Sequence, residues 1–180
     1  MSTLRMPPAP SAPRALPIII DVEASGFGRA GYPIEIGLVL PDGTPHCYLI
    51  SPARGWTAWD PRAEAVHGIS RETLLQRGSP ADEVARRLNA LLGHKTVYSD
   101  AWGFDLSWIG KLYDVAGVAQ SFRLASLYEL LDERQFEAWE GLREQVAGEL
   151  TLRRHRASGD ARILRETLIR AWRLRPDGTG

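Results

Sequence analysis

The fold of this chain is decided by one short segment, Pro17-Ile18-Ile19-Ile20-Asp21-Val22-Glu23-Ala24-Ser25-Gly26. An aliphatic run of this length that stops at a glycine is typical of a buried strand ending in a turn. Because side chains alternate across a strand, Asp21 and Glu23 leave the same face together. Two neighbouring carboxylates repel each other, and a fold keeps them most readily when a cation lies between them. The strand end is therefore either half of a metal site or a polar edge that faces water.

Composition limits what the chain can be. Its 180 residues, 44% of them hydrophobic, are enough for one well-buried core. We predict a disordered proline-rich tail over residues 1–16 and a single domain over residues 17–175. No apolar run is long enough to cross a bilayer, and residues 1–15 lack the apolar segment of a secretory signal. We therefore expect a cytoplasmic protein without a membrane partner.

The net charge and the cysteine content of the chain do not point to a particular function. The formal net charge is zero, so no global charge marks the chain as a nucleic-acid-binding protein. The single cysteine, Cys47, cannot form an internal disulfide, which agrees with a reducing compartment. It lies in an apolar stretch, and we predict that it belongs to the core.

The predicted elements describe a mixed α/β sheet. Strands over 33–40 and 46–50 follow the first strand through short turns, which predicts an antiparallel meander of three strands. Helices and strands then alternate, which is typical of parallel strands flanked by helices. Further strands are predicted over 95–99 and 122–124, and helices over 61–67, 70–76, 80–92, 103–116, 126–148 and 158–174.

Two other segments carry side chains that can complete a metal site. Asp105 lies in the first turn of a predicted helix, just beyond a buried strand, where α/β folds bind ligands. His155 precedes the last predicted helix and Asp160 lies in its first turn, so these two side chains can converge. Each segment also has a purely structural interpretation, because aspartates often cap helices and loop histidines are often surface residues.

Taken together, the motifs resemble the DEDDh-type (DnaQ-like) 3′–5′ exonuclease family of the ribonuclease H-like superfamily. The resemblance covers about residues 17–173, nearly the whole of the predicted domain. The family's motifs occur in order as Asp21-Val22-Glu23, Ile34-Glu35-Ile36-Gly37, Ala65-Val66-His67-Gly68-Ile69, Phe104-Asp105-Leu106, and His155 with Asp160.

The resemblance implies a ribonuclease H-like fold and two divalent cations, magnesium or manganese. Four carboxylates would hold the cations: Asp21, Glu23, Asp105 and Asp160. His155 completes the five catalytic residues as the base that takes a proton from the attacking water, since histidine titrates closest to working pH. Hard cations prefer oxygen ligands, and a pair about 4 Å apart activates water and stabilises a leaving oxygen.

The resemblance also implies the residues that bind the substrate: Ala24, Ser25, Gly26, Phe27 and His67. Gly26 permits a close approach of the terminal nucleotide because it has no side chain. Phe27 is predicted either to stack on a terminal base or to belong to the core. His67 either lies near the nucleotide or only braces the linker between two short helices.

The chain departs from the family pattern at two places. Ala24 and Ser25 stand where family members often have two threonines, so one hydroxyl is lost. Ser99 and Asp100 stand where histidine and asparagine are frequent, which adds a carboxylate close to the predicted metals. We do not expect Asp100 to replace Asp105.

The sequence therefore predicts a metal-dependent 3′–5′ exonuclease that acts on single-stranded DNA or frayed ends and releases nucleoside 5′-monophosphates. Two alternatives stay open. One is a 3′–5′ exoribonuclease similar to oligoribonuclease, and the other is a catalytically silent nucleic-acid-binding module of the same fold. In each case the expected partner is a nucleic acid 3′ end, DNA or RNA, and no sequence feature predicts an oligomer or a polymerase partner.

Overall fold

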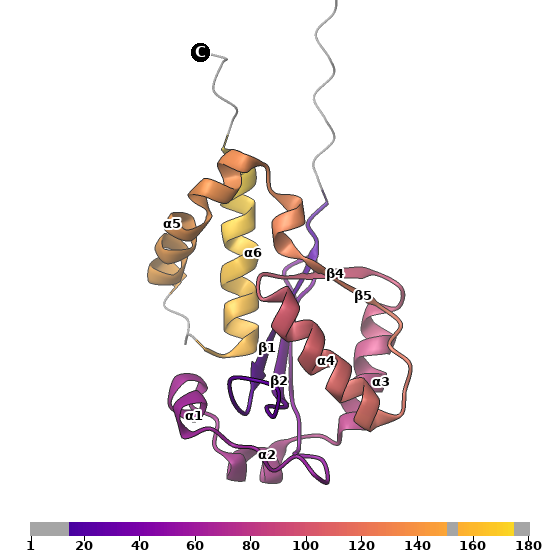
Figure 1. Cartoon of the computed structure of the whole chain (residues 1–180). Coiled ribbons are helices and arrows are strands. Elements are labelled where there is room, and N and C mark those ends of the chain that lie inside the picture. Colours follow the sequence, from indigo (N-terminus) through magenta and orange to yellow (C-terminus); the bar gives the residue numbers. More distant parts are fainter. Residues whose placement is uncertain (1–14, 151–154, 175–180) are drawn as a thin grey trace, which may run out of the picture.

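The computed structural model describes residues 15–150 and 155–174 (Figure 1). The strands of the sheet are β1 (Ile18–Ala24), β2 (Pro33–Val39), β3 (Pro45–Leu49), β4 (Thr96–Ser99) and β5 (Arg123–Ser126). They are arranged in the order β3-β2-β1-β4-β5. The pairs β1–β2 and β2–β3 are antiparallel, whereas β1–β4 and β4–β5 are parallel. The predicted mixed sheet, with its antiparallel meander and added parallel strands, is confirmed.

The helices flank this sheet. They are α1 (Pro61–His67), α2 (Arg71–Arg77), α3 (Ala81–Leu92), α4 (Trp102–Ala116), the 3₁₀ turn η1 (Leu127–Leu130), α5 (Glu133–Leu150) and α6 (Ala157–Arg173). Within the described residues, none of these helices is both long and apolar enough to span a membrane. Residues 1–14 of the predicted tail and residues 151–154 and 175 of the predicted domain lie outside the described part of the chain.

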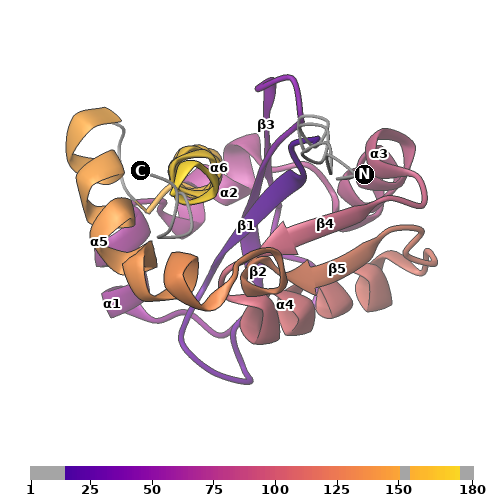
Figure 2. The same ribbon diagram turned by 90° about the horizontal axis from the view of Figure 1, so that it is seen from above.

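The alternation of side chains along β1 divides the molecule into two packed layers. Ile18 and Ile20 face one side of the sheet, where they pack with α3 and α4. Ile19 faces the other side, where it packs with α6 and α5. Figure 2 shows these two helix layers on opposite sides of the sheet. Asp21 and Glu23 follow Ile19 at intervals of two residues, so their side chains lie on the α6 side.

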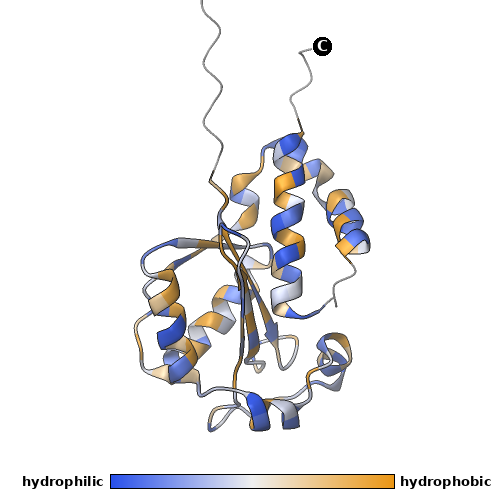
Figure 3. Cartoon of the chain, turned by 180° about the vertical axis from the view of Figure 1, so that it is seen from behind, coloured by the Kyte–Doolittle hydropathy of each residue, from blue (hydrophilic) through white to orange (hydrophobic). Residues whose placement is uncertain are grey.

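Helix α6 is amphipathic, as its sequence predicts. Figure 3 shows hydrophilic and hydrophobic residues alternating along it, the pattern of a helix with one buried side. Its buried side packs against β1 and β2, and consists of Ala157, Ala161, Ile163, Leu164, Thr167, Leu168 and Ala171.

The first turn of α6 lies directly on β2 at Gly37. A Cβ atom on Gly37 would overlap the backbone of Ala157 and Ser158. Glycine is therefore required here by close approach of two backbones rather than by an unusual backbone angle. Because Gly37 pairs with Asp21 across the strands, this contact sets the start of α6 beside the acidic end of β1.

The segment over 126–148, predicted to be mostly helix, is divided into a short 3₁₀ helix and a longer α-helix. β5 continues to Ser126, η1 follows, and α5 starts only at Glu133. A reciprocal cap explains the late start, because the Gln135 backbone N–H donates to Asp132 Oδ1 over 2.9 Å while the Asp132 N–H donates to Gln135 Oε1 over 3.1 Å. Local capping thus outweighs the helical pattern of the preceding residues.

The predicted burial of Cys47 is also wrong. Cys47 lies on β3, which is an edge strand of the sheet, and its residue is exposed. An edge strand has a neighbouring strand on only one side, so an apolar run on it does not have to be buried.

We predict that Gly37→Ala destabilises the protein by about 3 kcal/mol, because the added methyl group forces α6 away from β2. The free energy of unfolding from urea denaturation measures this. The matched control is Gly110→Ala, in the interior of α4, where an added Cβ meets no atom within 4 Å. Alanine there should stabilise the protein by up to about 1 kcal/mol. Equal stabilities of Gly37→Ala and the wild type would contradict the proposed backbone contact.

Candidate metal centre and active site

Three carboxylates from two distant segments meet at one end of the sheet. Asp21 and Glu23 of β1 and Asp160 of α6 each offer an oxygen atom, and these oxygen atoms lie within 4.8 Å of one another. All three residues are partly buried. Asp160 is more than 130 positions from Asp21 and Glu23 in sequence, and the packing of α6 on β2 brings the two segments together.

The acidic group borders a cavity of about 310 Å³ between β1, the end of β4, α5 and α6. His155 lines this cavity together with Asp160. His155 is exposed, and its φ of 59° is in the left-handed region that a non-glycine residue rarely adopts. The predicted convergence of loop histidine and helix aspartate is therefore present in the geometry.

Asp105 is set deeper than the other carboxylates. It lies in the first turn of α4 and is only 1% exposed. The buried Ser99 hydroxyl at the end of β4 donates a hydrogen bond to Asp105 Oδ2. Its other oxygen, Oδ1, is buried without a hydrogen-bond partner in the described residues. An unpartnered carboxylate oxygen is costly in a protein interior, and it is available as a ligand.

The carboxylates destabilise one another's charged forms. Burial, followed by the charges of Asp105, Glu23 and Asp160, raises the pKa of Asp21 well above its usual range. Burial and the nearby Asp160 raise the pKa of Glu23 to about 7. Burial raises the pKa of Asp105 to about 8, although the Ser99 hydroxyl opposes the shift. In the absence of a cation these groups therefore favour protons near neutral pH.

This arrangement fits divalent cations. A cluster of carboxylate oxygens is the donor set that hard cations such as magnesium and manganese prefer. A cation would replace the protons that the raised pKa values favour. Asp21, Glu23 and Asp160 would hold a cation directly. Asp105, predicted as a fourth ligand, is not one of the three residues whose oxygen atoms converge and does not line the main cavity, although its charge acts on Asp21.

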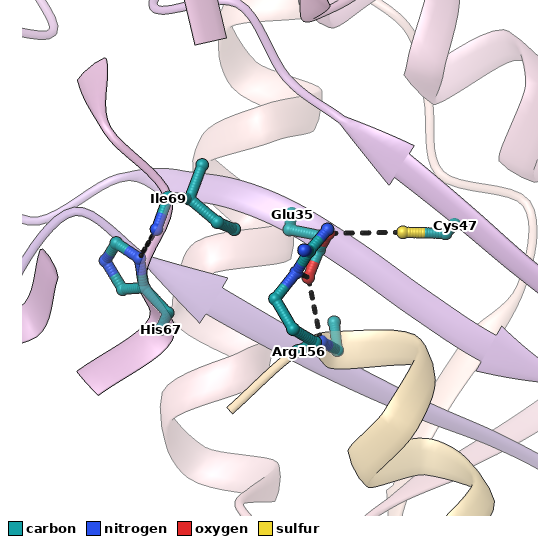
Figure 4. Close-up of polar contacts among 6 residues, drawn as sticks. Glu35, Cys47, His67, Ile69 and Arg156 are labelled. Carbon is teal, nitrogen blue, oxygen red and sulfur yellow. Dashed lines mark hydrogen bonds and ion pairs between the residues drawn. The ribbon is translucent and has the colours of Figure 1, made fainter. Parts of the chain in front are cut away.

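An ion pair anchors the start of α6 to β2 (Figure 4). Glu35 is fully buried, and its carboxylate accepts hydrogen bonds from Arg156 Nε at 3.1 Å and Nη2 at 2.5 Å, and from the Ala157 backbone N–H at 2.9 Å. Burial would raise the pKa of Glu35, but the bonds from Arg156 and Ala157 outweigh it and hold the pKa below its usual value. Glu35 also pairs with Glu23 across the strands, so Arg156 compensates two neighbouring charges.

His67 occupies a second, smaller cavity beside the acidic group. Its Nδ1 accepts a hydrogen bond from the Ile69 backbone N–H at 3.0 Å (Figure 4), which places the ring proton on Nε2. The ring is only 2% exposed, burial lowers its pKa, and Nε2 has no partner in the described residues. The cavity, of about 60 Å³, is also lined by Glu23, Ala24, Gly26 and Phe27. His67 therefore braces its loop and keeps one donor free.

The remaining predicted substrate residues divide into two groups. Phe27 is 68% exposed, so its alternative assignment to the core is wrong. Ser25 is fully buried, and its hydroxyl accepts from the Tyr32 backbone N–H at 3.1 Å, which closes the loop after β1. Four of the five predicted residues thus lie around the small cavity, while the Ser25 side chain stabilises the loop that holds them.

Comparisons with known proteins agree with this architecture. No family model and no curated protein matches the sequence. Among solved structures, the exonuclease I of Methylocaldum szegediense superposes with a TM-score of 0.67 and 16% identity, covering 87% of this chain and 40% of that chain. The zinc-bound E. coli exonuclease I complex with single-stranded DNA superposes with a TM-score of 0.65 and 16% identity, covering 89% and 41%. The chain has a ribonuclease H-like fold. It spans about two fifths of the length of these structures.

Sequence reasoning missed several residues that shape the site in this ribonuclease H-like fold. Ser99, noted only as a departure from the family pattern, holds Asp105. Glu35 and Arg156 form the anchor of α6, although a glutamate inside an otherwise apolar strand already signals a buried partner. Arg143 of α5 lines the main cavity, and nothing in its helical sequence context distinguishes it.

We predict that the metal-free protein loses stability between pH 5 and pH 8. The pKa values of Asp21, Glu23 and Asp105 are higher in the folded protein than in the unfolded chain, so proton binding to these groups stabilises the fold. This stabilisation is complete below the unfolded-state pKa values of about 4. This contribution is lost as the pH rises through the folded-state values of about 7 and 8 for Glu23 and Asp105. Thermal unfolding in EDTA should give a falling Tm over this interval, and added magnesium should raise the Tm more at pH 8 than at pH 5.

The variant Asp21→Asn tests the cause of this pH dependence. It removes one of the repelling charges, so it should stabilise the metal-free protein at pH 8 by about 1 to 2 kcal/mol and flatten the pH profile. The same variant should gain less from magnesium. A pH profile unchanged by Asp21→Asn, with the same gain from magnesium, would show that the carboxylates are not electrostatically coupled.

We predict that Glu35→Gln destabilises the protein by about 3 kcal/mol, because it leaves the guanidinium of Arg156 without its buried counterion. Urea denaturation provides the measurement. Glu149→Gln removes the partner of Arg170 on the exposed surface between α5 and α6 and serves as the control, with little expected change. Equal losses of unfolding free energy in Glu35→Gln and Glu149→Gln would show that the buried ion pair stabilises the protein no more than the exposed one.

Proposed function

We propose that the protein is a metal-dependent 3′–5′ exonuclease that acts on single-stranded DNA or frayed 3′ ends and releases nucleoside 5′-monophosphates. One observation carries the proposal: Asp21, Glu23 and Asp160 converge within 4.8 Å beside a cavity that His155 also lines. The ribonuclease H-like fold that presents them is also found in exonuclease I.

We infer that the site holds two divalent cations, magnesium or manganese, with Asp21, Glu23, Asp105 and Asp160 as the ligands. Two such cations activate water and stabilise the charge of a departing oxygen. The four carboxylates also differ in depth, since Asp105 is buried while the other three border open space. These carboxylates would hold the cations, and the cavity beside them would admit the substrate.

His155 is the proposed general base. Its side chain is exposed at the cavity, so it can reach a water molecule that approaches the carboxylates from solvent. Arg156, the next residue in the chain, is bound by Glu35, so the backbone directly after His155 is anchored to β2. The anchor thus positions the base relative to the acidic cluster.

We propose that the residues around the small cavity next to Glu23 contact the terminal nucleotide, which is larger than the cavity itself. Gly26 offers a surface without a side chain, and the exposed ring of Phe27 is available for stacking on a base. The Nε2–H of His67, which has no partner among the described residues, can donate to an oxygen of the nucleotide. Single-stranded DNA is the proposed substrate because exonuclease I has been solved with oligonucleotides such as dA16 and dT13.

A labelled-oligonucleotide assay tests this function. Purified protein with magnesium or manganese should progressively shorten a 5′-labelled single strand from its 3′ end. Asp21→Ala and His155→Ala should each reduce the rate by at least about 100-fold, since each removes a group of the catalytic unit. Asp82→Ala, which changes an exposed aspartate of α3, is the matched control and should retain the wild-type rate.

The same assay separates the alternatives. Matched DNA and RNA strands, a mismatched duplex and an RNA dinucleotide would reveal an exoribonuclease by preferential cleavage of RNA, since only RNA has the 2′-hydroxyl. Binding of oligonucleotide with no shortening at high protein concentration would identify the catalytically silent module. Shortening that persists in both Asp21→Ala and His155→Ala would contradict the assigned site.

A further inference from the structure

Arg143 is a basic residue at the rim of an otherwise acidic cavity. It projects from α5, and among the described residues that line the main cavity it is the single arginine or lysine. Asp21, Glu23 and Asp160 line the same cavity. A guanidinium at this place is a group that can meet a substrate phosphate.

The guanidinium of Arg143 is only loosely held. Its Nη1 lies 3.8 Å from Asp100 Oδ2, which is longer than a hydrogen bond. Its Nε and Nη2 donate to one oxygen of Glu140, at 3.2 and 2.9 Å. Glu140 lies one turn earlier on the same helix, and its side chain is 64% exposed. Partly exposed pairs of this kind contribute little free energy, so Arg143 can exchange these partners for another anion.

Asp100 is the second carboxylate near the guanidinium of Arg143. It lies just after β4, its side chain is only 17% exposed, and it lines the cavity opposite α5. Its carboxylate therefore lies near Nη1 at the cavity, while Nε and Nη2 of the same guanidinium are bound to Glu140 on α5. Without a partner, Asp100 would add one more negative charge to a site that has to admit a phosphate.

Two roles follow from the pair. Arg143 either neutralises Asp100 and has no contact with substrate, or it is held by Asp100 in a position to bind substrate. The geometry favours the second role, because a neutralising arginine would be expected to form direct hydrogen bonds with the carboxylate. The 3.8 Å separation instead leaves guanidinium donors available, and a planar guanidinium matches two oxygens of a phosphate.

We propose that Arg143 binds a non-bridging oxygen of the phosphate next to the 3′ end, and that Asp100 holds it in place before the substrate arrives. This inference rests on the proposed nuclease function. It assigns a substrate contact to α5 and explains the carboxylate at position 100 as a holding group.

A double-mutant cycle tests the proposal. Binding of a fluorescent single-stranded oligonucleotide is measured by anisotropy with magnesium in the His155→Ala background, and steady-state kinetics are measured with His155 intact. Arg143→Ala should weaken binding about 10- to 100-fold, as expected for loss of a hydrogen bond to a charged group. Arg143→Lys, which keeps the charge but not the planar fork, should lose less. Arg86→Ala, in an exposed pair with Asp82 on α3, is the control.

Asp100→Asn distinguishes the two roles. If Arg143 binds phosphate and Asp100 positions it, Arg143→Ala should still weaken binding in the Asp100→Asn background, though by a smaller factor than with Asp100 present. If Arg143 only neutralises Asp100, the double variant should bind as tightly as Asp100→Asn alone, and the proposal is overturned. Unfolding curves of each variant exclude a general loss of structure.

The kinetics separate this inference from the proposed function. A wild-type protein that shortens oligonucleotides, with a double variant equal to Asp100→Asn, overturns the role of Arg143 and leaves the nuclease function intact. A wild-type protein that neither binds nor shortens oligonucleotides overturns both.

Discussion

The structure depends on one contact, the seating of the first turn of α6 on β2. Gly37 allows the two backbones to meet, and the buried Glu35 fixes Arg156 and the Ala157 amide above them. Because β2 is the antiparallel neighbour of β1, this contact places Asp160 beside Asp21. A modest shift of α6 would separate the two halves of the acidic cluster and leave the rest of the sheet intact.

The carboxylates at the centre of the site repel one another, and the surrounding apolar core stabilises the fold that holds them together. Apolar side chains on both faces of β1 stabilise the sheet, while the acidic end of the same strand carries charges that burial makes unfavourable. The protein offsets this in separate ways, with an ion pair for Glu35, a hydroxyl for Asp105 and a nearby guanidinium for Asp100. Asp21 and Glu23, whose pKa values stay raised, are among the groups proposed to receive cations.

Most of the fold could be predicted because its signals are local. Alternation in 18–24, the turn before 45–49 and the amphipathic pattern of 157–173 each act within a few residues. The prediction failed where a neighbour decided the outcome. The cap between Asp132 and Gln135 delays α5, and the edge position of β3 exposes Cys47. Neither the competition for a cap nor the order of strands can be read from a hydrophobic pattern.

For the site, the sequence by itself determined that Asp21 and Glu23 share one face of a strand, because side chains alternate along a strand. It also determined that Asp105 and Asp160 lie in the first turns of helices. Only the tertiary structure decided that Asp160 meets Glu23, that Asp105 lies deeper and is held by Ser99, and that α5 presents an arginine to the cavity. These relations join residues far apart in the chain, and packing of backbones and pairing of buried charges establish them after the local elements have formed.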